Sequence, residues 1–197
     1  MTKQAIQVAH PELVGGGVTS LHSHSGGGGA PSPMPTYSWN SGGIAITAIN
    51  TLLMDLFNAS GSGKVVKIFQ IEAYQRNTAS VTGVSICLEA FRTTDVGTGG
   101  SVRTADKMDT ADPNIPAEIT CRTSPTGGAT PTGAPIAVGN IYTEEGANNQ
   151  SQLPMYENPG TGVRTRLTLR EGEGIRIVSG PWGTAGTITL RIAAEVS

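Results

Sequence analysis

The sequence contains little charge and few aromatic side chains. Charged residues make up 14% and aromatic residues 5% of the 197 positions. The 13 lysines and arginines are outnumbered by 15 aspartates and glutamates, and the formal net charge is −2. The basic residues form no run, so the phosphate-neutralising footprint of a nucleic-acid-binding protein is missing. We therefore expect no nucleic-acid partner.

The chain also has only two cysteines and no long apolar segment. Cys87 and Cys121 stand in separate predicted strands without a CxxC spacing, which argues against a disulfide framework or a zinc knuckle. No segment approaches the roughly 20 apolar residues of a membrane-spanning helix, and residues 1–14 lack the apolar core of a signal peptide. These features predict a protein that stays in a cytoplasm, with reduced thiols and no membrane insertion.

No short motif for catalysis or phosphate binding is present. The sequence has no GxSxG, HExxH or catalytic Cys/His pattern. In NASGSGKVV, Asn58 replaces the first glycine of a phosphate loop and Val65 replaces its Ser/Thr, so this stretch is interpreted as a turn. Acidic residues that could converge as a glycosidase pair are Glu144, Glu145 and Glu157. Such loop carboxylates are usually solvated, and we expect that the protein is not an enzyme.

Glycine and proline, by contrast, are abundant. The 27 glycines and 12 prolines indicate a turn-rich chain of short strands, and hence an all-β fold. From residue 37 onward, short apolar runs alternate with turn signals at a spacing typical of a sandwich or barrel. In VTGVSICLEAF, residues 81–91, Ile86 and Leu88 share one face while Cys87 takes the other. Cys87 is therefore expected to face away from the main core.

Other segments are predicted as strands with less uniform patterns. KVVKIFQIEAY, residues 64–74, alternates with Val66 and Ile68 on one face and Ile71 on the other. Residues 163–170 and 186–196 alternate as half-buried antiparallel strands. The expected short strands in the loop-rich middle lie around Ile119, 136–142 and 153–156. Residues 44–64 fit either a helical stripe or strands, and the following NASGSG turn favours strands.

The first 36 residues differ from the rest of the chain. They contain few large apolar side chains and end in SGGGGAPSPMP, in which glycine lifts conformational restriction and proline blocks regular pairing. This composition predicts an extended Gly/Pro-rich N-terminal arm over residues 1–36 and a β-sandwich domain over residues 37–197. Contacts with another molecule would hold such an arm in place.

Two histidines in the arm suggest a metal site. His22 and His24 are spaced so that an extended strand places both imidazoles on one side. Two ligands are too few, but three copies around a threefold axis would supply six nitrogens, a set suited to iron or nickel. The alternative is that both histidines are ordinary polar residues of a Gly/Ser-rich segment.

Three aromatic residues are candidates for a binding surface. Trp182 lies between turn residues in GPWGTAG, and together with Tyr142 and Tyr156 it could form an exposed platform for sugar or protein. The alternative is that Trp182 closes one end of the sandwich. The sequence does not separate these two interpretations.

Three stretches resemble segments of tailed-bacteriophage virion proteins. LHSHSGGGG is similar to segments of tail fibres and spikes, while LFNASGSGKVVKI and LTLREGEGIRIV resemble paired strands of virion proteins of jelly-roll type. The resemblance implies an antiparallel jelly-roll-like β-sandwich and a virion structural protein, commonly a homotrimer. It also implies that His22 and His24 could hold iron on the trimer axis, as matching residues do in such fibres.

These observations lead to two expectations for function. The first is a non-enzymatic capsid decoration (cement) protein that trimerises and uses residues 1–36 to grip the major capsid protein or another virion protein. The second is a tail fibre, spike or head-fibre module whose loops bind host surface glycans. In both cases the protein would belong to the virion and be assembled in the cytoplasm of the bacterial host.

Overall fold

The described part of the chain consists of strands and loops, without a helix. The structure is a computed structural model, and the chain divides into two units between Pro33 and Met34. The described residues all belong to the second unit and are 34–75, 84–143, 152–158, 166–183 and 186–197. Residues 1–33 of the expected arm, including His22 and His24, lie outside them. Thr36 already belongs to the first strand, one residue before the predicted start of the sandwich.

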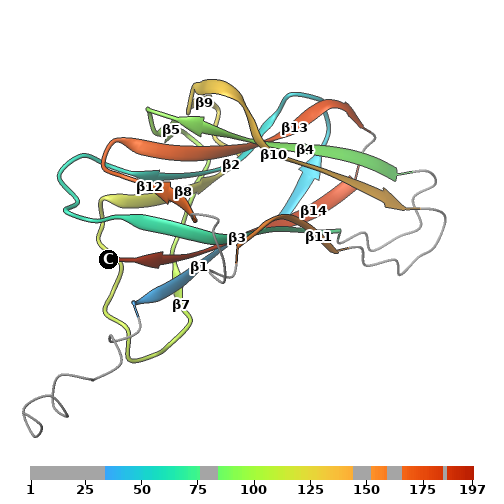
Figure 1. Cartoon of the computed structure of the whole chain (residues 1–197). Coiled ribbons are helices and arrows are strands. Elements are labelled where there is room, and N and C mark those ends of the chain that lie inside the picture. The colour runs from blue at the N-terminus through green and yellow to red at the C-terminus, as the bar shows by residue number, and fades with distance from the viewer. Residues whose placement is uncertain (1–33, 76–83, 144–151, 159–165, 184–185) are drawn as a thin grey trace, which may run out of the picture. The chain divides into compact units, whose positions relative to one another are not determined.

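Two six-stranded antiparallel sheets form the domain, and they stack as two layers (Figure 1). Sheet A contains, in order, β11 (Gln152–Glu157), β3 (Val66–Gln75), β14 (Gly186–Val196), β1 (Thr36–Ile46) and β7 (Asp106–Lys107), with β12 (Leu167–Leu169) also paired to β3. Sheet B contains β10 (Pro131–Thr143), β4 (Val84–Thr93), β13 (Glu173–Gly183), β2 (Leu52–Asn58), β8 (Ile119–Thr123) and β6 (Ser101–Arg103). A small third sheet pairs β5 (Gly97–Thr98) with β9 (Gly127–Gly128).

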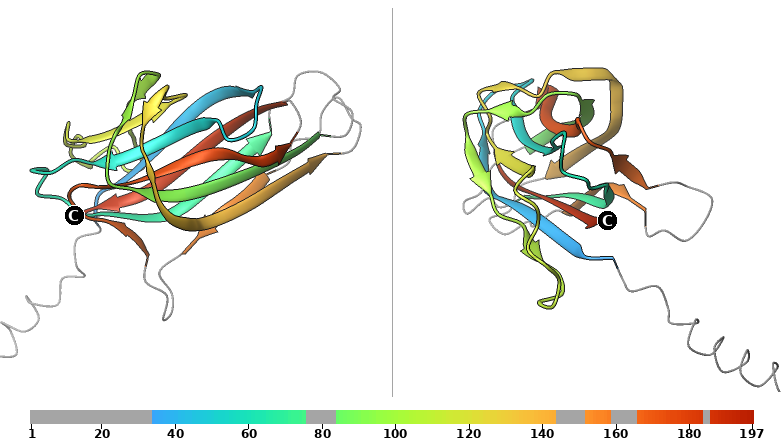
Figure 2. Two further views of the ribbon diagram at one scale, coloured as in Figure 1. Left: turned by 90° about the horizontal axis from the view of Figure 1, so that it is seen from above. Right: turned by 90° about the vertical axis from the view of Figure 1, so that its left-hand side faces the viewer.

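The order of the eight long strands is that of a jelly roll. Along the chain, β1, β3, β11 and β14 enter sheet A, while β2, β4, β10 and β13 enter sheet B. Within the sheets, the order β11-β3-β14-β1 faces the order β10-β4-β13-β2, which is the arrangement of two interleaved Greek keys. Figure 2 shows the strands of both sheets running along one long direction. The predicted all-β, jelly-roll-like sandwich is confirmed.

Alternating side chains fill the space between the sheets. Ile188, Leu190 and Ile192 of β14 are fully buried and point to the same side of sheet A. Trp39 and Tyr37 of β1 are buried beside them, with ring centroids 6.4 Å apart. Burial of aliphatic and aromatic surface is the main stabilising contribution in such a sandwich.

Residues 44–64 form two strands, as the turn signal predicted. Ile44 and Ile46 end β1, a bend follows, and β2 begins at Leu52. Leu53, Met54 and Leu56 of β2 are buried in the core, whereas Ile49, which also fits the helical spacing, lies in the bend and is 51% exposed. The pairing of β2 with β13 shifts register here. Ile177 pairs with Met54 but Val178 pairs with Leu52, and this shift interrupts the strict alternation of β2.

Two details of the predicted strands need correction. Ile71 was expected on the face opposite Ile68, but both side chains are fully buried in the core. The register of β3 against β14 shifts near Gln70, so the inward alternation changes phase there. The strand expected over residues 163–170 is shorter in the described region, where it covers Leu167–Leu169; residues 163–165 lie outside that region.

Candidate functional site

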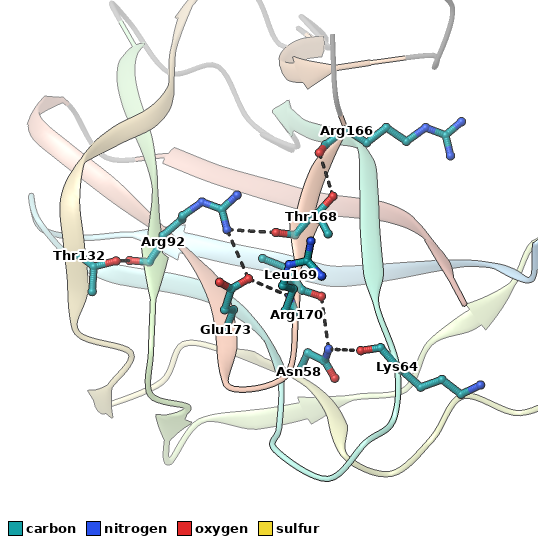
Figure 3. Close-up of polar contacts among 9 residues, drawn as sticks. All are labelled: Asn58, Lys64, Arg92, Thr132, Arg166, Thr168, Leu169, Arg170 and Glu173. Carbon is teal, nitrogen blue, oxygen red and sulfur yellow. Dashed lines mark hydrogen bonds and ion pairs between the residues drawn. The ribbon is translucent and has the colours of Figure 1, made fainter.

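Polar side chains of sheet B reach across to β12 at one end of the sandwich (Figure 3). The Asn58 Nδ2 group donates hydrogen bonds to the carbonyl oxygens of Lys64, at 2.9 Å, and Leu169, at 3.3 Å. The Arg92 guanidinium donates from Nη1 to the Thr168 carbonyl oxygen at 3.0 Å. Because β12 has only three residues, these side-chain bonds supplement its short pairing with β3.

Replacing Arg92 with methionine should test this bridge. The variant keeps most of the apolar stem but removes the bond to Thr168, so we expect the free energy of unfolding to fall by about 1 kcal/mol. Urea denaturation followed by tryptophan fluorescence measures the change. Arg170→Met is the matched control, because Arg170 is exposed and its backbone N–H, which donates to Glu173 at 2.8 Å, is retained. Equal losses in the two variants would contradict a specific role for Arg92.

A shallow pocket lies beside this bridge, between the edges of the two sheets. Its volume is about 210 Å³, and it is lined by Arg92, Ile136, Tyr156, Arg166 and Leu167. The Tyr156 hydroxyl accepts a hydrogen bond from the Leu167 N–H at 2.8 Å. The pocket therefore combines an apolar wall, a hydroxyl and cationic residues, but it is smaller than typical small-molecule sites.

Both cations of the pocket are already engaged within the protein. Arg92 contacts the Thr168 carbonyl and lies 3.8 Å from the Glu173 carboxylate. Arg166 forms an ion pair with Glu195 and lies over the Phe69 ring at 5.8 Å. Figure 3 shows its side chain pointing away from Arg92. The two guanidinium groups therefore do not converge on a common anion.

A buried carboxylate connects sheet B to the β5–β9 pair. Asp55 of β2 is 1% exposed and accepts a hydrogen bond from the Gly97 N–H at 2.9 Å. Its cross-strand neighbours are Arg176 and Arg122. These arginines donate to the carbonyl oxygens of Ala129, at 2.9 Å, and Gly99, at 3.1 Å. The three side chains thus hold two loop segments onto the outer surface of sheet B.

The contact at Gly97 requires glycine. A Cβ atom at this position would lie 2.8 Å from Asp55 Oδ2, closer than a carbon atom can approach. Burial raises the pKa of Asp55, whereas the Gly97 N–H and the charge of Arg122 act in the opposite direction. Asp55 Oδ1 accepts no hydrogen bond from the described residues. Asp55 therefore has a perturbed pKa and lies buried beneath the β5–β9 pair.

A second buried carboxylate lies on the outer surface of sheet A. Glu72 accepts hydrogen bonds from Gln70, Tyr74 and Gln152, the last at 3.0 Å, and lies 3.6 Å from the Arg191 guanidinium. Burial and the bond to Glu72 raise the pKa of Tyr74. Four donors surround the carboxylate, as expected for a buried charge that stabilises structure. The cluster joins β3 to β11 and β14.

Sequence reasoning missed both carboxylates, although the sequence carries a signal for each. Asp55 interrupts the apolar run LLMDLFN, and a charged residue within such a run has to find partners. Glu72 lies between Ile71 and Ala73, both buried in the core, so alternation alone places it on the outer face. Neither sequence pattern reveals the partners, which come from strands distant in the chain.

The predicted aromatic residues occupy different parts of the sandwich. Tyr156 is half-buried in β11 and lines the pocket. Trp182 lies in β13 and is 44% exposed. Tyr142 belongs to β10, where its backbone pairs with Ser85, and its side chain lies outside the described part. Tyr156 and Trp182 thus belong to different sheets, and their role in binding stays a prediction.

The cysteines are free and buried, in β4 and β8. Cys87 lies outside the main core cluster, as predicted, and its Sγ atom packs against Gly180. Burial raises the pKa of both thiols, most strongly at Cys121. The described residues contain no group of three His, Cys, Asp or Glu side chains able to hold a metal ion. Nor do they include a helix suited to cross a membrane.

The fold and these clusters define a class of protein, the jelly-roll β-sandwich. Among the described residues, the charged clusters join strands and loops of the same domain. Asp55, Glu72, Asn58 and Arg92 each connect elements that are distant in sequence. No protein-family model matches the chain, and comparisons with curated proteins and with solved structures give no match either.

Proposed function

We propose that the protein is a non-enzymatic structural component of a tailed-bacteriophage virion, a decoration protein bound to the capsid through its N-terminal arm. The observation that carries the proposal is the complete jelly roll, an architecture found among viral capsid and lectin domains. The buried carboxylates of Asp55 and Glu72 connect strands and loops within this domain. A rigid domain joined to a Gly/Pro-rich arm suits a protein that covers a surface and grips a neighbour.

The arm would supply the attachment. The sandwich holds the chain from Pro35 onward, because the Pro35 carbonyl accepts a hydrogen bond from the Val196 N–H at 3.0 Å. Residues 1–33 precede this point and would make the contacts with the major capsid protein or with other copies. Three copies would also bring His22 and His24 to one axis, where six imidazoles could hold iron.

The second candidate is a receptor-binding module of a fibre or spike. Trp182 favours it, since an exposed indole can stack on a sugar ring, and this residue is 44% exposed. Such a module would contact host glycans through loops of the sandwich, and the arm would be dispensable for that contact.

Virions of the phage that encodes the chain provide the test. We expect immunogold labelling over the capsid, and we expect purified full-length protein to rebind shells that lack it. A chain that starts at Met34 should retain the β-sheet circular dichroism spectrum but lose shell binding. Labelling of the tail, together with cell binding that survives the truncation, would support the receptor-binding module and contradict the capsid role.

A further inference from the structure

Strand β10 forms a long edge whose second half lacks the usual protection. It spans 13 residues and pairs with β4 on one side, while no described strand pairs with its other side. Pro131, Pro135 and a register shift against β4 lie in its first half, and the pairing is continuous from Ala137 to Thr143. The other described edges are protected by being short or interrupted: β6 has three residues, β7 two and β12 three, and β11 contains Pro154. Natural sheets shorten, charge or cover their edges because a free edge pairs with other chains.

The side chains of β10 also suit a partner strand. Val138 is 55% exposed, and Ile136, two residues before it, is 38% exposed and also lines the pocket beside Tyr156 and Leu167. Residues 136–143, IAVGNIYT, contain neither a charged residue nor a proline. This stretch therefore offers backbone groups that no described strand pairs, beside two apolar side chains.

Strand β11 does not occupy this edge. The two strands meet across the opening of the sandwich, where a Cβ atom on Gly139 would lie 2.5 Å from Leu153 Cδ2. This is a contact between the two sheets through side chains, and β11 pairs its backbone with β3. Among the described strands, none therefore occupies the backbone edge of β10.

The chain carries a segment of matching character. Residues 4–9, QAIQVA, are uncharged and place Ile6 and Val8 two residues apart, as a strand with one apolar face requires. The 25 residues between Val8 and Met34 can extend to about 80 Å at most, which is enough to reach an adjacent molecule. Pairing of two β10 edges would instead give a twofold dimer, whereas a closed ring of three requires two different surfaces.

We propose that residues 4–9 of one copy add as a strand to the free edge of β10 in a neighbouring copy. The inference rests on the homotrimer in the proposed function, but not on the location of that trimer in the virion. Backbone hydrogen bonds would provide affinity, and Ile6 and Val8 would cover Ile136 and Val138. Each copy gives one strand and receives one, so three copies can close into a ring.

Disulfide trapping between two full-length chains tests the exchange. One tagged chain carries Val138→Cys, and a second chain with another tag carries a cysteine in place of Ala5, Ile6, Gln7 or Val8. The pairs are co-expressed, oxidised and separated on non-reducing gels. We expect bonds between the two chains whose yield alternates with period two along residues 5–8, since disulfides require Cβ atoms about 4 Å apart. Cys87 and Cys121 are buried and should not compete.

A matched control uses Val102→Cys in place of Val138→Cys. Val102 is 62% exposed and lies on the three-residue edge strand β6, so it should give little bonding and no alternation. Bonds between two Val138→Cys chains would overturn the proposal in favour of edge-to-edge pairing. An absence of bonds between the two chains, or a yield that does not alternate along residues 5–8, would also overturn it.

A second variant separates this inference from the proposed function. Val138→Lys places a charge on the edge and should convert trimers to monomers in sedimentation velocity, whereas Val102→Lys should remain trimeric. A trimer that survives Val138→Lys would contradict strand exchange while leaving the capsid role intact. Alternating cross-links in a protein that does not bind shells would contradict the capsid role and leave the exchange intact.

Discussion

Replacement of Trp39 by alanine is expected to lower the free energy of unfolding by about 3–5 kcal/mol, a large part of the stability of an average domain. Trp39 lies between the two sheets, is 1% exposed and is among the largest fully buried side chains described. Its removal would leave a cavity that the surrounding strands cannot fill. Equilibrium denaturation in urea, followed by circular dichroism, measures the loss.

The second tryptophan provides the control. Trp182 is 44% exposed, so Trp182→Ala should cost less than about 1 kcal/mol. Trp39→Phe retains a ring in the core and should lose clearly less stability than Trp39→Ala. Similar losses for Trp39→Ala and Trp182→Ala would contradict the position of Trp39 in the core.

Replacement of Asp55 by alanine is expected to cost about 1–3 kcal/mol, because the Gly97 N–H loses its acceptor and two arginines lose their nearby negative charge. Asp55→Asn preserves shape and an acceptor oxygen, so it should cost less. Protease cleavage near residues 94–100 or 126–130 should become faster in Asp55→Ala, since these segments are docked onto sheet B around this carboxylate.

The same residue should make stability depend on pH. The folded-state pKa of Asp55 is raised above its ordinary value of 3.8, so the folded protein holds the proton more tightly than the unfolded chain does. The stabilisation from this tighter proton binding is fully present below the pKa that Asp55 has in the unfolded chain. It is lost as the pH rises through the higher pKa of Asp55 in the folded protein. The stability of the wild type relative to Asp55→Asn should therefore fall as the pH increases from 4. A relative stability that rises with pH would show that the arginines dominate over burial.

The architecture could be predicted from local sequence patterns. The alternation of Ile86 and Leu88, the turn before Lys64 and the apolar positions of residues 186–196 depend on neighbouring residues, and the structure confirms each strand. The change of phase at Ile71 was missed, because a register shift depends on the partner strand, and a single sequence does not show which strand that is.

The polar clusters were less accessible to sequence reasoning. Arg122 and Arg176 flank Asp55 only because β8 and β13 pair on either side of β2, and these strands lie more than 50 residues farther along the chain. Tyr156 was selected for its aromatic ring, but its place in the pocket depends on the distant Arg92 and Ile136. Contacts of this kind follow from topology, which the local pattern does not encode.

The position of β14 between β1 and β3 affects how the protein folds during its synthesis. These two neighbours are complete by residue 75, yet β14 spans Gly186–Val196 and pairs with both. During synthesis, the ribosome has to translate more than a hundred further residues before sheet A can receive its central strand. Folding should therefore finish only late in translation or after release, and until then β1 and β3 lack the strand that joins them.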